Sequence, residues 1–95
     1  MKLRWLRSGS SSLRLHVSFI AADNPRAATD VRRRIRTAVL RLVDFPQSGR
    51  AGQLAGTREL VVPGLPYIVV YRVGRDAVEI LRVFHAARNW PPLLQ

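Results

Sequence analysis

The chain has 95 residues, and its 16 Lys and Arg against 6 Asp and Glu give a net charge of +10. This length allows one domain, over residues 1–95, and a hydrophobic fraction of 47% excludes a disordered basic tail, which lacks the apolar surface needed to fold. The absence of cysteine excludes a disulfide framework, a thiolate metal site and a cysteine nucleophile.

A short strand and a helix are predicted first. Leu3 and Trp5 alternate with their neighbours, as in a strand with one covered face. The segment Ser8-Gly9-Ser10-Ser11-Ser12 follows, and because serine hydroxyls cap helices, one of these serines is expected to start a helix that ends near Ala22. Leu15 and Phe19 form a second apolar line beside the main stripe of this helix, which predicts burial on more than one side.

Asp23-Asn24-Pro25 predicts the start of a second helix, because Asn24 can cap it and Pro25 loses no hydrogen bond at the first helical position. This helix is expected to continue to about Asp44. Its apolar residues recur at steps of three and four, and most of its arginines point away from them. These arginines form either a solvated face or a surface for an acidic partner, and the candidates are Arg32, Arg33 and Arg36.

Residues 46–56 have the composition of an exposed loop, and three strand-like runs follow at 59–62, 67–73 and 78–85. The short links between these runs predict an antiparallel meander. The expected fold class is α+β, in the order β-α-α-β-β-β, with a helical hairpin packed on a small, mostly antiparallel sheet. Tyr67 and Tyr71 share one face of their strand and are expected in the core, as is His16 on the first helix.

The polar residues near the end of the chain are the main candidates for chemistry. His85 lies near several arginines, and imidazole can move a proton while guanidinium stabilises phosphate charge. An exposed histidine at a strand end is more often simply solvated. The cluster consists of Arg82, His85, Arg88, Asn89 and Trp90.

No cofactor, metal or small-molecule substrate is indicated by the sequence, because motifs for phosphate loops, zinc helices and nucleophile elbows are missing. No apolar run approaches the length of about 18 residues that a membrane span needs. Charges interrupt the first residues too closely for a signal peptide. We therefore expect a cytoplasmic protein without a membrane partner.

The order of several segments resembles the RelE/ParE toxins of bacterial type II toxin–antitoxin modules. The resemblance covers about residues 19–90, and the fold of that family agrees with the pattern above. The segments are Phe19-Ile20-Ala21-Ala22-Asp23-Asn24-Pro25, Phe45-Pro46-Gln47-Ser48-Gly49-Arg50, Thr57-Arg58-Glu59-Leu60, Tyr67-Ile68-Val69-Val70-Tyr71-Arg72-Val73, Val78-Glu79-Ile80-Leu81-Arg82-Val83-Phe84-His85 and Arg88-Asn89-Trp90.

This resemblance implies a cognate antitoxin with an acidic C-terminal segment as partner, which suits the charge of +10. RelE-like members are ribosome-dependent messenger-RNA endonucleases, whereas ParE-like members inhibit DNA gyrase. Ile68 stands where the nucleases carry an arginine, and only Arg50 and Gln53 match the segment of their further catalytic residues. The ParE-like interpretation is therefore favoured, and the chain also departs from the family pattern between Ser8 and Leu15.

The favoured hypothesis is a gyrase-directed toxin that is not an enzyme, with Arg82, His85, Arg88 and Trp90 binding the target. The second is a ribosome-dependent endoribonuclease that uses His85 and Arg88. The third is an inactive binding domain with the toxin fold.

Overall fold

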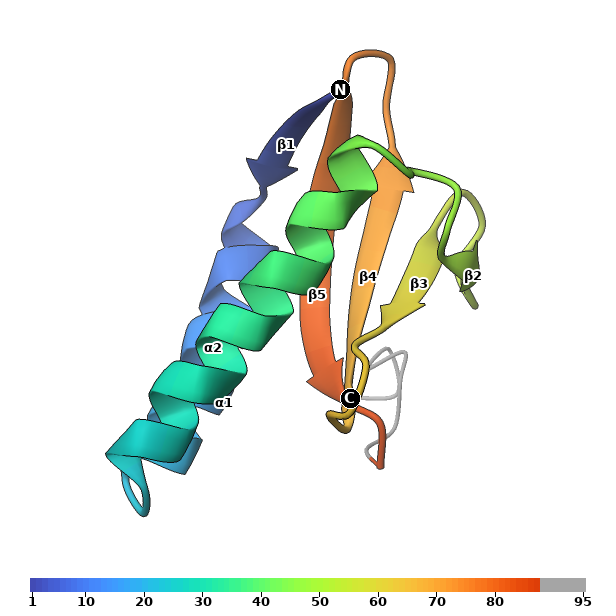
Figure 1. Ribbon diagram of the computed structural model, residues 1–95. Coiled ribbons are helices and arrows are strands. Elements are labelled where there is room, and N and C mark those ends of the chain that lie inside the picture. The colour runs from blue at the N-terminus through green and yellow to red at the C-terminus, as the bar shows by residue number, and fades with distance from the viewer. Residues whose placement is uncertain (88–95) are drawn as a thin grey trace.

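The computed structural model describes residues 1–87, which form two helices and a short 3₁₀ helix on one side of a five-stranded sheet (Figure 1). The strand order is β1-β5-β4-β3-β2. The elements are β1 (Lys2–Trp5), α1 (Arg7–Ala21), α2 (Pro25–Leu40), η1 (Arg41–Val43), β2 (Arg50–Ala51), β3 (Arg58–Val61), β4 (Tyr67–Val73) and β5 (Ala77–His85).

The predicted α+β fold and the meander are confirmed. β3, β4 and β5 pair antiparallel in sequence order, and β1 joins the edge of the sheet parallel to β5. Two features were missed by the sequence analysis. The expected loop contains the two-residue strand β2, and the last turn of the second helix tightens into η1.

The turn between the helices forms as predicted. The Asn24 side chain accepts a hydrogen bond of 3.0 Å from the Ala27 N–H, and Pro25 occupies the first helical position. Both helices pack on the sheet through a shared hydrophobic core, to which the helices and the strands contribute side chains. Its largest fully buried members are Ile35, Val39, Leu42, Val62, Val69, Tyr71, Val78, Ile80 and Val83.

The predicted serine cap of α1 is wrong. The helix begins at Arg7, and its N-cap residue, Leu6, makes no side-chain capping bond. Two of the serines instead attach α1 to β5: the Ser8 hydroxyl donates to the Leu81 carbonyl (2.7 Å), and the Val83 N–H donates to the Ser12 hydroxyl (2.8 Å). These bonds satisfy backbone groups beside the register shift between β4 and β5, where the sheet pairing is irregular.

Gly9 lies between these two serines, where α1 approaches the backbone of β5 closely. A Cβ atom at this position would lie 2.4 Å from the Ile80 carbonyl oxygen, which is far inside normal contact distance. Glycine is therefore required here for packing rather than for an unusual backbone angle. The serine and glycine segment of α1 thus docks on β5.

The second apolar line of α1 is not buried, contrary to the prediction. Leu15 is 69% exposed and Phe19 is 74% exposed, whereas Leu13 on the opposite side of the helix is 4% exposed. The hairpin is a single layer, so α1 has the sheet and α2 on one side and solvent on the other (Figure 1). Periodicity identified both apolar lines correctly, but it could not show that residues 1–87 cover only one of them.

Candidate functional site

The end of the sheet brings together both histidines of the chain. Tyr67 at the start of β4 pairs with His85 at the end of β5. The Tyr67 ring makes an edge contact with the His85 ring and another with the His16 ring of α1, each at a centroid distance of 5.3 Å. The core position predicted for Tyr67 is confirmed, since it is 7% exposed, and His16 is half-buried against it.

His85 is half-buried, and one of its ring nitrogens has a backbone partner. The Ala87 N–H donates a hydrogen bond of 3.1 Å to His85 Nδ1. This contact requires Nδ1 to be an acceptor, so the neutral ring carries its proton on Nε2. The imidazole is thus oriented both by the backbone and by the Tyr67 ring.

Arg82 does not share a face of the sheet with His85. Successive residues of a strand point to opposite faces, and Arg82 pairs with Val70, whereas His85 pairs with Tyr67. Val70 belongs to a small apolar cluster with Ile68 and Phe84, while Tyr67 belongs to the main core under the helices. The predicted target-binding residues are therefore divided between the two faces, and Arg88 and Trp90 lie outside the described residues.

Three positions were compared above with the catalytic positions of the nucleases. Their residues make contacts within the fold. Ile68 is 7% exposed within its apolar cluster. Arg50 donates from Nε and Nη2 to one carboxylate oxygen of Glu59, at 3.1 and 2.9 Å, and Glu59 is 4% exposed. The Gln53 N–H points to the other oxygen at 3.4 Å. Arg50 therefore neutralises a buried carboxylate and fixes the loop to β3.

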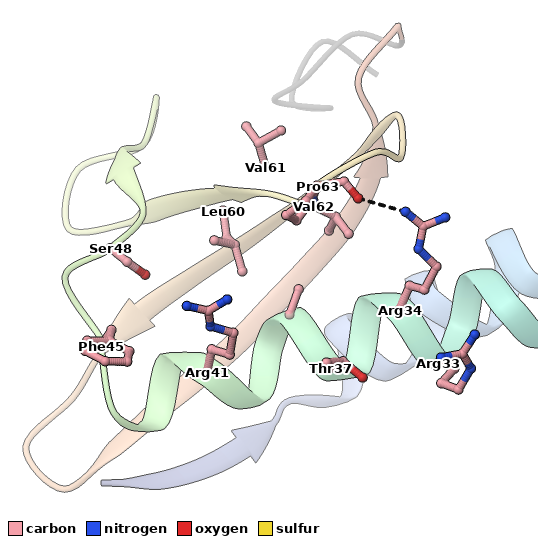
Figure 2. Close-up of a pocket in the computed structure, with 11 residues that line it drawn as sticks. Arg33, Arg34, Thr37, Arg41, Phe45, Ser48, Leu60, Val61, Val62 and Pro63 are labelled. Carbon is pink, nitrogen blue, oxygen red and sulfur yellow. Dashed lines mark hydrogen bonds between the residues drawn. The ribbon is translucent and has the colours of Figure 1, made fainter.

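The α2 arginines divide between two grooves, one on each flank of the helix. The groove between α2 and the sheet, here the β3 groove, has a volume of about 450 Å³ (Figure 2). It is lined by Arg33, Arg34, Thr37, Ala38, Arg41, Phe45, Ser48, Leu60, Val61, Val62 and Pro63. The groove between α1 and α2, here the Trp5 groove, has a volume of about 280 Å³ and is lined by Trp5, Ser10, Leu13, Arg14, Val17, Ser18, Arg32 and Arg36.

The predicted group of Arg32, Arg33 and Arg36 is thus not one surface. Arg33 lines the β3 groove, whereas Arg32 and Arg36 line the Trp5 groove. The Arg36 guanidinium lies over the Trp5 ring, 5.9 Å from its centroid, which favours a cation–π contact. Sequence periodicity placed all three away from the core but could not distinguish the two flanks.

Most of the positive charge around the grooves is not balanced by carboxylates of residues 1–87. Asp30 pairs with Arg33 and lies 3.8 Å from Arg34 Nη1. Over residues 1–87, no carboxylate lies within ion-pair distance of the other groove arginines, which are Arg14, Arg32, Arg36 and Arg41. Such an excess attracts anionic partners at long range.

The described part of the chain offers no group of three His, Asp or Glu side chains that could hold a metal ion. None of its helices is long and apolar enough to cross a membrane.

Comparisons with known proteins agree with this architecture. Residues 3–90 match the family model of the ParE toxin of the type II toxin–antitoxin system parDE. The chain is 45% identical to Y4kP of Sinorhizobium fredii, which carries the name of a candidate toxin, over 93 residues, 98% of this chain and 96% of that protein. It is 40% identical to toxin RelE2 of Caulobacter vibrioides over 70 residues, which cover 74% of this chain and 77% of the relative.

Among solved structures, the chromosomal ParDE toxin–antitoxin system from P. aeruginosa contains a chain that superposes with a TM-score of 0.81 at 25% identity, covering 90% of this chain and 95% of the other. The family match spans nearly all of the described residues, and the sequence relatives carry toxin names. The chain therefore belongs to the ParE toxin family of type II toxin–antitoxin systems.

Proposed function

We propose that this toxin inhibits DNA gyrase when it is free and is neutralised by a cognate antitoxin. The observation that carries the choice of target is the burial of Ile68, at the position where the resemblance to RelE-like nucleases requires an arginine. An apolar side chain inside a cluster cannot contact a scissile phosphate. Arg50, the remaining basic residue of that region, is bonded to Glu59.

The target surface in this proposal is the end of the sheet, with Arg82, His85, Arg88 and Trp90. His85 is oriented on one face by Tyr67, and Arg82 projects from the other face. A target that contacts both must approach the strand end rather than lie flat on one face.

The antitoxin in this proposal binds the α2 arginines through acidic residues, and opposite charge accelerates such an encounter. The parDE family match and the toxin–antitoxin system among the structural neighbours support a partner of this kind. Arg32, Arg33 and Arg36 were predicted to contact it. Because they lie on two flanks of α2, a segment bound in one groove contacts only part of this set.

A ribosome-dependent ribonuclease is the second candidate. The pair of histidines around Tyr67 favours it, because two imidazoles at one site can serve as acid and base in phosphodiester cleavage. The 40% identity to a protein named RelE2 points in the same direction.

Induced expression of the chain without an antitoxin tests this proposal. We expect growth arrest with gyrase-dependent breaks in DNA and intact messages, and we expect growth to recover when the antitoxin encoded beside the toxin gene is co-expressed. A gene with an early stop codon is the control. Cut messages with intact DNA would favour the ribonuclease, and normal growth with both nucleic acids intact would indicate an inactive toxin fold.

A further inference from the structure

The Trp5 groove gathers positive charge from two helices. Arg14 of α1 and Arg32 and Arg36 of α2 line it, and all three side chains are exposed. Over residues 1–87 none of the three makes an ion pair, and neither Asp nor Glu lines the groove. The groove therefore presents three cations to solvent without a counter-charge from this part of the chain.

One of these cations rests on an aromatic platform. The Arg36 guanidinium lies over the Trp5 ring, 5.9 Å from its centroid. Trp5 is half-buried and packs against the main core, which fixes the position of the ring. A guanidinium stacked on a ring still directs its N–H groups outward in its own plane, where they can donate to an oxyanion. Arg36 therefore loses less side-chain entropy on binding an anion than a freely moving arginine would.

The spacing of the arginines suits a chain of anions. Arg32 and Arg36 lie one helical turn apart, about 6 Å along the axis of α2, so each of them can contact a different anionic group. Arg14 adds a third cation from the α1 side of the groove, and the hydroxyls of Ser10 and Ser18 also line it. Arginine and serine side chains are common donors to the phosphate oxygens of nucleic acids.

The remaining lining disfavours a protein segment or a small molecule. Leu13 is 4% exposed and Val17 is half-buried, so the groove offers little apolar surface for an amphipathic helix to cover. Its volume of about 280 Å³ is below the range of about 300–1,000 Å³ that is typical of pockets enclosing small molecules. Phosphates of a strand that lies along the groove need only the cations and the hydroxyls.

We propose that the Trp5 groove binds the phosphate backbone of a DNA strand, with Arg32 and Arg36 on different phosphates and Arg14 as a third contact. The choice of DNA rests on the proposed function, because gyrase acts on DNA. The free toxin then contacts gyrase through the end of the sheet and DNA through this groove. In the neutralised complex, the antitoxin that contacts the α2 arginines covers the same side chains. Phosphate contacts carry no sequence information, so DNA of any sequence is expected to bind.

Three substitutions that each remove one positive charge test the choice of groove. Arg41 is the matched control for Arg32 and Arg36: it is also exposed and makes no ion pair over residues 1–87, but it lines the β3 groove. Fluorescence anisotropy of a labelled DNA duplex measures binding to the full toxin, between about 50 and 200 mM salt. Circular dichroism checks that each variant is folded.

We expect Arg32→Gln and Arg36→Gln each to weaken DNA binding by about fivefold to tenfold and to lower the slope of log K against log salt by about 1. Arg41→Gln is expected to change the affinity by less than about twofold. Equal losses for the three variants would show attraction by net charge without a defined site and would overturn the inference. Absence of DNA binding by the unmodified toxin would overturn it as well.

The fluorescence of Trp5 reports on the groove directly. The chain has two tryptophans, so a Trp90→Phe background leaves Trp5 as the only emitter. Added duplex DNA is expected to change the Trp5 emission with the same midpoint as the anisotropy. Unchanged emission during binding would place the DNA elsewhere and contradict the proposal.

Two competitors test the choice of ligand. Single-stranded RNA and a polyglutamate peptide, each with the same number of charges as the DNA duplex, are added to the toxin–DNA complex. DNA is expected to be displaced by neither at equal concentration. Displacement by the RNA would overturn the choice of DNA, and displacement by the peptide would favour an acidic protein segment in the groove.

Failure of this inference and failure of the proposed function give different results. If the toxin inhibits gyrase but Arg32→Gln and Arg36→Gln bind DNA like the unmodified toxin, the proposed function stands and the groove assignment fails. If both substitutions weaken DNA binding as expected but gyrase is not inhibited, the groove assignment stands and the proposed function fails.

Discussion

Replacing Ile35 by alanine is expected to destabilise the toxin by about 3–4 kcal/mol, because the change removes a fully buried side chain and leaves a cavity between α2 and the sheet. Such a loss is a large fraction of the stability of a small domain. Urea unfolding followed by circular dichroism measures it. Leu40→Ala is the matched control on the same helix: Leu40 is 61% exposed, and its replacement is expected to cost less than about 0.5 kcal/mol. Similar costs for the two variants would contradict the packing of α2 described above.

Replacing Gly9 by alanine is expected to destabilise the toxin by about 2 kcal/mol, although alanine favours helices over glycine by about 1 kcal/mol. The added Cβ would lie 2.4 Å from the Ile80 carbonyl oxygen, so α1 would have to move away from β5 and strain its serine contacts. Ser11→Ala is the control, since Ser11 is exposed on the same helix. If Gly9→Ala stabilises the protein in the same unfolding experiment, the docking of α1 through this segment is wrong.

The elements were predictable where local chemistry is strong. Asn24 and Pro25 define the start of α2, and a continuous run of β-branched and aromatic residues defines β4 with its observed bounds, Tyr67–Val73. The serines among residues 8–12 led to the wrong prediction of a helix cap. A serine hydroxyl can cap a helix or bond to a neighbouring strand, and only the tertiary structure decides which of the two occurs. The exposure of Leu15 and Phe19 could not be predicted from the sequence either, because it depends on whether another element packs on that side of α1.

The candidate site was less predictable than the fold. His16, Tyr67 and His85 are far apart in sequence, and their contact follows from the register of β4 and β5 and from the placement of α1. The β3 groove could have been suggested by the four-residue spacing of Arg33, Thr37 and Arg41. Its lining also includes Leu60 of β3, which sequence spacing does not reveal.

The net charge of +10 attracts any anionic partner. The positions of the arginines indicate which surface each partner is expected to bind. Most of the arginines that line the two grooves lie on α2, whereas Tyr67 and His85 lie on β4 and β5. Our account therefore assigns the basic grooves to the neutralising partner and the end of the sheet to the target.

The most direct test of this account is DNA supercoiling by purified gyrase in the presence of the purified toxin. We predict that the toxin inhibits supercoiling and traps cleaved DNA, and that prior addition of the antitoxin prevents both effects. Unchanged supercoiling, together with cleavage of messages on purified ribosomes by the same toxin preparation, would contradict it.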